Sequence, residues 1–181
     1  MQPIGPLMWE HRLIERMVAV LKAELGRMAS SDCADPLAID SAVDFFRTYA
    51  DRTHHGKEED ILFRELGGKA LSDEHRRIID ELLAEHVVGR REVGCLVAAK
   101  ERYVQGDISA LAGIRGHLGR LVEFYPRHIE KEDRDFFHPC MAYFTKGELN
   151  GMLEEMWEFD RKMIHERYGR MVSEWETRTA P

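Results

Sequence analysis

The chain contains 181 residues, of which 26 are Lys or Arg and 33 are Asp or Glu, so its formal net charge is −7. This length predicts one domain, residues 1–181, that buries a core without help from disulfides or a structural metal, and the acidic balance argues against nucleic acid as the main partner. No apolar run approaches the roughly 18 residues of a membrane span, no signal peptide is visible, and three widely spaced cysteines fit a reducing compartment, so we expect a cytoplasmic protein with no membrane partner.

Apolar residues recur every three or four positions in five segments, each of which we expect to be a helix. In chain order these segments cover about residues 7–28, 37–66, 72–105, 108–139 and 145–175. Gly67–Gly68 and Gly106–Asp107 are predicted stops, Ser72 is a predicted N-cap, and Thr145 with Glu148 forms a capping box. No alternating segment of strand length appears. The sequence therefore predicts an all-α fold, an antiparallel up-down-up-down four-helix bundle over about 7–141 with an additional C-terminal helix over about 145–175.

The fifth segment carries an apolar stripe that some other surface must cover. The stripe contains Leu149, Met152, Met156, Phe159 and Met163, with Trp157 and Trp175 nearby. An uncovered face of this size would favour aggregation. We expect the helix to pack either across the outside of the bundle or on a second chain, and the second alternative predicts a homodimer through the C-terminal helix.

Two stretches of the chain repeat one pattern. Residues 54–63 read HHGKEEDILF and residues 128–137 read HIEKEDRDFF, so both fit H-x-x-K-E-[ED]-x-x-[LF]-F. A Glu-His pair precedes each copy, at residues 10–11 and at residues 85–86. The first two helices therefore form a unit that the third and fourth repeat, and equivalent residues are expected to meet near the centre of the bundle.

The repeat places six metal-type ligands on interior helix faces, because residues four apart on a helix lie on the same side. The candidate metal ligands are His11, His54, Glu58, His86, His128 and Glu132. Six inward donors are too many for one tetrahedral zinc. They suit two octahedral-type ions with the two carboxylates bridging, and a donor set rich in nitrogen and carboxylate favours iron. The expected cofactor is a pair of iron ions with an oxo or hydroxo bridge and an open position for a small ligand.

The pattern H…HxxxE…H…HxxxE on four helices resembles the hemerythrin-like (HHE cation-binding) family, over roughly residues 7–141. The resemblance implies a four-helix bundle with a non-haem di-iron centre that binds oxygen, nitric oxide or peroxide, or senses iron and oxygen. Oxygen-carrying members have a further histidine four residues after the one on the third helix, where this chain has Arg90. One iron is thus expected to lack a nitrogen ligand, which makes reversible oxygen carriage less expected than di-iron binding.

The neighbours of the six candidates receive lesser roles. His55 follows His54 by one residue, about 100° around a regular helix, so we expect it beside the metal ligands or exposed. Glu59 and Asp133 are expected to support the ligands or face solvent, and Lys57 and Lys131 to pair with surface acids. Arg90 either lies on the side of its helix with its charge in solvent, or reaches the metal pocket as a fixed cation.

The predicted function is binding of, or reaction with, oxygen, nitric oxide or peroxide at an open di-iron site. An iron-handling or iron- and oxygen-sensing protein without turnover, and a di-iron oxidoreductase in nitrosative or oxidative stress repair, are the alternatives. The sequence leaves open whether the chain is an enzyme, and no catalytic nucleophile set is visible. No Glu is followed three residues later by His, which removes the ferritin-like alternative, and no nucleotide-binding loop motif is present.

Overall fold

A computed structural model describes the backbone of residues 2–179 and the side chains of residues 2–163, and over this part of the chain the fold is all-helical with no strand. The side chains of Trp175 and Met171 therefore lie outside the described residues. The helical segments are α1 (Ile4–Ser31), α2 (Pro36–Asp44), η1 (Phe45–His55), η2 (Glu58–Phe63), α3 (Arg64–Gly67), α4 (Asp73–Val104), α5 (Ala110–Glu130), η3 (Lys131–Phe136), α6 (Phe137–Cys140), η4 (Met141–Tyr143) and α7 (Lys146–Thr179). None of the described helices has both the length and the apolar composition that a membrane span needs.

Local sequence explains where the helices begin and end. The Ser72 hydroxyl accepts a hydrogen bond from the backbone N–H of His75, as an N-cap does. Thr145 and Glu148 make the reciprocal bonds of a capping box at the start of α7. The helix that ends with α3 is followed by Gly68. These predicted boundaries are confirmed.

Three stretches depart from regular α-helix. The segments η1, η2 and η3 are π-helical, in which the backbone bonds run from residue i to i+5. Segment η1 follows α2 without a break, and η3 follows α5 in the same way. The two copies of the repeated motif fall on these wider stretches, and π-helical turns are often found at functional sites.

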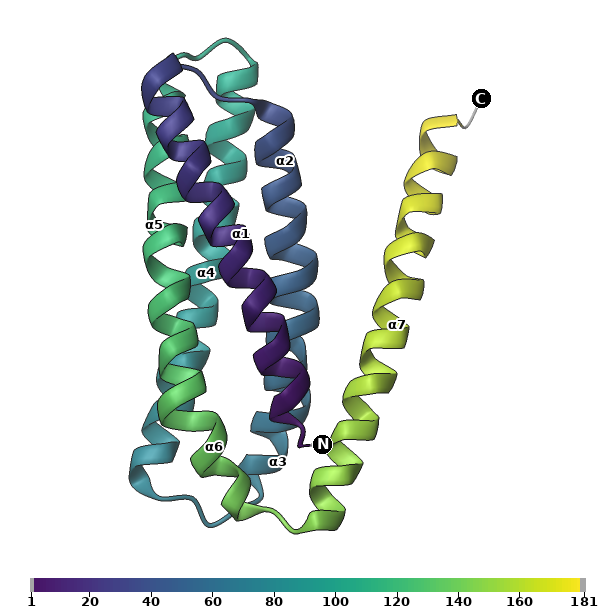
Figure 1. Ribbon diagram of the computed structural model, residues 1–181. Helices are drawn as coiled ribbons and strands as arrows, with labels where there is room; N and C mark the ends of the chain where they lie inside the picture. Colours follow the sequence, from purple (N-terminus) through teal and green to yellow (C-terminus); the bar gives the residue numbers. More distant parts are fainter. Residues whose placement is uncertain (1, 180–181) are drawn as a thin grey trace.

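The long helices contact one another in a closed ring (Figure 1). Helix α1 lies against α5 and η1, and α4 lies against α5, α2 and η1. Helix α7 contacts η1 and η2 on the outside of this ring.

A buried polar layer divides the apolar core into two clusters. On α1, Leu7 belongs to one cluster and Ile14 to the other, with the buried His11 between them. On α4, Leu82 and Val93 flank His86 in the same way. Polar side chains can remain in such a layer only if each finds a hydrogen-bond partner or a ligand.

The first part of α7 packs on its own chain. Met152 and Met156 are buried in the cluster that contains Leu7, and Arg64 of α3 forms an ion pair with Glu155. Of the two expected coverings for the apolar stripe, the described side chains use the outside of the same bundle. Trp157 remains 47% exposed.

Candidate metal centre

The fold brings the six predicted residues together in the polar layer between the two core clusters. They come from six elements: His11 from α1, His54 from η1, Glu58 from η2, His86 from α4, His128 from α5 and Glu132 from η3. All six side chains are buried. Among the described residues, two groups of donor atoms lie close enough to hold a metal ion, with all atoms of a group within 4.8 Å of one another. The groups are His11, His54, Glu58 and Glu132, and His55, His86 and His128.

The two glutamates of the first group also face histidines of the second group, each with its other oxygen. Glu58 Oε1 is 3.5 Å from His54 Nε2, and Glu58 Oε2 is 3.4 Å from His86 Nε2. Glu132 Oε2 is 3.1 Å from His11 Nε2, and Glu132 Oε1 is 3.2 Å from His128 Nε2. A carboxylate with its two oxygens directed to two neighbouring sites has the arrangement needed to bridge two cations.

Each of the four predicted histidines directs its outer nitrogen, Nδ1, at a carboxylate. The pairs are His11–Asp133 at 2.7 Å, His54–Glu10 at 3.0 Å, His86–Glu59 at 2.7 Å and His128–Glu85 at 2.8 Å. Because an ionised carboxylate only accepts, Nδ1 carries the proton and Nε2 presents a lone pair to the interior. This carboxylate–histidine pairing is the usual way in which proteins fix a metal-binding imidazole.

The lysines of the repeated motif hold two of these carboxylates. Lys57 donates to Glu10 and, at 2.7 Å, to Asp160 of α7, and Lys131 donates to Glu85 at 2.5 Å. Lys57 is fully buried, so the expectation that it pairs with surface acids was wrong. Its buried charge is balanced because two carboxylates face it.

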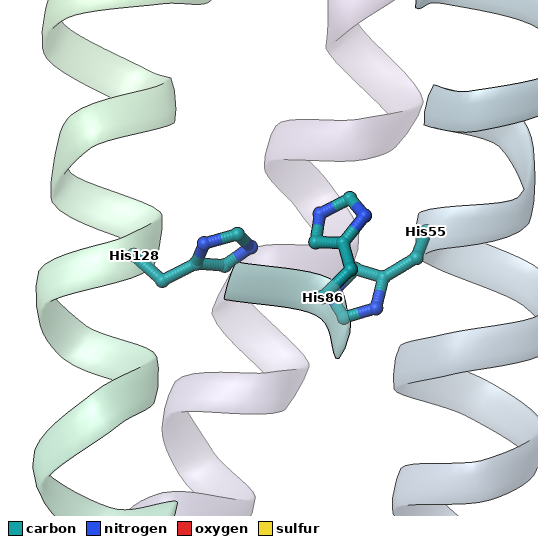
Figure 2. A group of neighbouring side chains, drawn as sticks. All are labelled: His55, His86 and His128. Carbon is teal, nitrogen blue, oxygen red and sulfur yellow. The ribbon is translucent and has the colours of Figure 1, made fainter. Parts of the chain in front are cut away.

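His55 does not lie where regular helix geometry places it. It is 2% exposed, and its ring stacks on His86 with 3.8 Å between the ring centroids. In Figure 2 the side chains of His55 and His128 reach from opposite sides toward His86. Of the two expected positions, beside the metal ligands or exposed, the structure has the first. Both expectations assumed about 100° of rotation per residue. The i→i+5 winding of η1 widens the turn and leaves both His54 and His55 on the interior side.

One signal in the sequence could have found His55. In the second copy of the motif its place is taken by Ile129, which is also buried. The repeat thus predicts an interior position for His55. A histidine is unexpected there, because the equivalent residue in the second copy is apolar.

Arg90 does not reach into the layer. Its guanidinium donates to Asp51 at 2.7 Å and to Glu59 at 2.7 Å. Glu59 in turn receives the Nδ1–H of His86. Arg90 therefore fixes carboxylates that face two of the histidines.

The residues fit a cation, because their inner atoms lack partners without one. Both oxygens of Glu58 and of Glu132, and Nε2 of His86 and of His128, are buried with no hydrogen-bond partner among the described residues. Nε2 of His11 lies 2.8 Å from Nε2 of His54, and two lone pairs at that distance repel unless a proton or a metal ion lies between them.

Electrostatics point the same way. Burial and the nearby charge of Glu132 raise the pKa of Glu58 well above its usual value. Burial lowers the pKa of His11, but its hydrogen bond to Asp133 and the nearby carboxylate of Glu132 outweigh this effect and raise the pKa to about 9. Both shifts have one cause, the buried negative charge of the carboxylates, which a bound cation would offset.

Aromatic rings cover the layer, and two cavities approach it. Phe137 stacks on His11 at 5.5 Å and Phe124 stacks on His128 at 5.2 Å between ring centroids. A cavity of about 410 Å³ between α4 and α5 ends at His128. A smaller cavity of about 100 Å³ is lined by His55, among others.

Most of the chain is similar to one protein family. A family model described as the hemerythrin HHE cation binding domain matches residues 3–138. Neither the curated proteins nor the solved structures gave a significant match. The matched segment covers most of the chain and contains all six predicted residues. The chain therefore belongs to the hemerythrin HHE cation-binding family.

Proposed function

We propose that this chain is a non-haem di-iron protein that binds or reacts with oxygen, nitric oxide or peroxide. The observation that carries the proposal is the placement of Glu58 and Glu132, each of which directs one oxygen to each group of histidines. The ligands in this proposal are His11, His54, Glu58, His86, His128 and Glu132. A single ion would not require both carboxylates to face two ways.

The charges of the layer agree with a pair of divalent ions. The two glutamates contribute −2 and neutral imidazoles contribute nothing, so two ferrous ions would leave +2, which a bound hydroxide would lower to +1. Nitrogen and carboxylate donors together suit iron better than a hard oxygen-only or soft thiolate set would.

The protein itself would orient the imidazole ligands, shield the ligand position from water and admit a small molecule to it. Glu10, Asp133, Glu59 and Glu85 hold the outer nitrogens, so the imidazoles are fixed before any ligand arrives. When bound, an iron pair supplies one-electron redox chemistry and a Lewis-acidic position for a small ligand. The stacked phenylalanines limit the access of water to that position.

The smaller of the two cavities suits a small ligand. The cavity at His55 measures about 100 Å³, which corresponds to only about three water molecules at roughly 30 Å³ each. A diatomic molecule or peroxide fits this space. The cavity at His128, at about 410 Å³, has the volume of a pocket for a larger organic molecule, so the proposal of a small ligand rests on the metal-type donors and not on cavity size alone.

The architecture completes the proposal. We infer one domain over residues 1–181, built as an antiparallel up-down-up-down four-helix bundle with α7 added. The closed ring of helix contacts and the short connections between helices support this topology. A homodimer through α7 is proposed as well, because Trp157 on that helix is exposed.

Metal content tests the di-iron site. Iron-reconstituted protein is expected to bind two ions per chain, and His54→Ala or His128→Ala to retain one or none. His75→Ala is the matched control, because His75 bonds to Tyr143 away from the layer. A single ion per chain in the unmodified protein would contradict the bridged site.

Reactivity tests the ligand class. The reduced, iron-loaded protein is mixed with oxygen, nitric oxide or peroxide, and its visible absorption is followed over time. A spectral change with at least one of the three supports the proposal. Repeated turnover of peroxide or nitric oxide would identify an enzyme. No response to any of them would leave iron handling as the function.

A further inference from the structure

We propose that His55 is a fifth imidazole ligand, which binds the same metal ion as His86 and His128. The inference rests on the proposed di-iron function and adds a donor to it. It also makes the two metal positions unequal, with three histidines at one and two at the other.

The first observation is that His55 is buried although its two ring nitrogens, Nδ1 and Nε2, have no hydrogen-bond partner among the described residues. The side chain is only 2% exposed. Buried polar groups in native proteins are almost always paired, so an unpaired one calls for a ligand or a water molecule. A metal ion would take a nitrogen lone pair of this ring.

The second observation is geometric. A ring nitrogen of His55 lies within 4.8 Å of donor nitrogens on His86 and His128. The His55 ring lies 5.5 Å from that of His128 and 3.8 Å from that of His86, between centroids. The three side chains come from η1, α4 and α5, with the rings of His55 and His86 nearly parallel at 10° and the ring of His128 edge-on to both (Figure 2). Three imidazoles with neighbouring donor atoms are a common set for a transition metal.

The third observation is the comparison between the two halves. The equivalent of His55 in the second copy of the motif is Ile129, which is buried in the apolar core. The repeat therefore accepts a purely apolar side chain at this place, and packing alone does not require a histidine. A histidine in the first copy fits a role that the second copy does not have.

The surroundings of His55 also resemble those of the other histidines. Its Nδ1 faces Asp51 Oδ1 at 3.4 Å, and Arg90 holds that carboxylate by a bond of 2.7 Å. An outer carboxylate fixed by a basic residue likewise faces His54 and His128. Arg90, which occupies the position of the absent third-helix histidine, thus supports a donor that comes from another helix.

The inference changes the expected chemistry. With His55 the site would have five imidazoles and two carboxylates, so His55 would supply the nitrogen ligand that is missing at the position of Arg90. With three histidines at one position, His11 and His54 would be the two imidazoles that hold the other ion. The reason for disfavouring reversible oxygen binding is then removed.

X-ray absorption at the iron edge tests the inference on the unmodified, iron-loaded protein. The imidazole scattering is expected to correspond to five rings per pair of ions. Four rings per pair would overturn the role of His55 and leave the di-iron proposal intact. A single ion per chain would overturn the di-iron site, and with it this inference.

A variant series gives an independent measurement. His55→Phe keeps an aromatic ring on His86 and removes the nitrogens, and His55→Ile copies the second half of the repeat. Each is titrated with Co²⁺ against a chelator, beside the control His75→Phe. We expect one of the two Co²⁺ affinities to fall on the order of 100-fold or more, with the other within a few-fold and the control unchanged. Unchanged affinities at both positions in a folded variant would overturn the proposal.

Discussion

Glu85 and Glu10 occupy equivalent places in the two halves, where each accepts a hydrogen bond from a histidine and a second one from a lysine. Glu85 is the more exposed of the two, at 29% of its side chain against 7% for Glu10. It is therefore the better site for a substitution that alters the pairing without disturbing the core.

Glu85→Gln is expected to weaken metal binding by about 10-fold or more, because a neutral amide orients His128 less firmly and lowers its basicity. Two ions per chain should still bind at saturation. Competitive titration with a chelator measures the change. Glu81→Gln is the matched control, since Glu81 also accepts from Lys131 but does not contact His128. Equal losses in both variants would show that Lys131, and not the histidine, is responsible.

Glu58→Gln is expected to act in opposite directions on the two forms of the protein. It removes a buried carboxylate whose pKa is raised by burial and by Glu132, so the metal-free form should become more stable. A gain of about 1 kcal/mol would raise the melting temperature by roughly 2–4 °C for a chain of this size. Metal occupancy should fall to one ion or none. Calorimetry of metal-free samples checks the sign, and a lower melting temperature would contradict the argument.

The residue scale also shows what the sequence could and could not predict. His11 and His86 were identified because each lies in an apolar stripe and each follows a glutamate, and both lie in the layer. Regular α-helical rotation does not predict that His55 shares the interior side with His54, because η1 is wound more widely than an α-helix. The bonds of Asp133 to His11 and of Glu59 to His86 run between the two halves, and spacing along one helix carries no information about them.

At the scale of elements, the helix ends were predictable and the winding was not. Caps such as Ser72 act on backbone groups within a few residues, so local sequence reveals them. The π-helical segments have no comparable local pattern. The segment η1 begins at Phe45, nine residues before the first motif, so the motif itself does not mark where the wider winding starts. The place of α7 was likewise open, because an apolar stripe does not identify the surface that covers it.

Truncation after Ala142 should leave the six proposed ligands in the chain but lower its stability. Met152 and Met156 are buried on the bundle, and full burial of one such side chain contributes about 1.5–3 kcal/mol. Lys57 would also lose Asp160. Melting temperature, iron per chain and elution volume are compared for the two lengths. A truncated protein that stays helical and soluble but has lost all iron would mean that α7 supplies part of the metal site.

At the scale of the whole molecule, the polar layer lies between two apolar clusters and couples their stability to the metal. Without a cation, the layer contains buried carboxylate and imidazole atoms that have no partner among the described residues. An ion that binds only the folded chain stabilises it by mass action.

Removal of the metal by a chelator should therefore lower the melting temperature. Free metal at about 100 times its dissociation constant adds about 2.7 kcal/mol per ion, which for a chain of this size corresponds to a shift of several degrees. Calorimetry with and without chelator measures the shift. His54→Ala should show a smaller shift, because it retains fewer ions. An equal shift in both proteins would point to a metal bound elsewhere.

The four histidine–carboxylate pairs follow two rules of connection. Glu10 with His54, and Glu85 with His128, join residues of the same half, whereas Glu59 with His86, and Asp133 with His11, join opposite halves. Each half on its own would lack the carboxylate that orients one of its histidines. A separate two-helix unit of this kind could complete its site only by pairing with a second copy of itself, in which each copy lends one acid to the other. The single chain thus has the internal plan of a symmetric dimer in one polypeptide, and the pair of equivalent positions occupied by His55 and Ile129 is a place where the two halves differ.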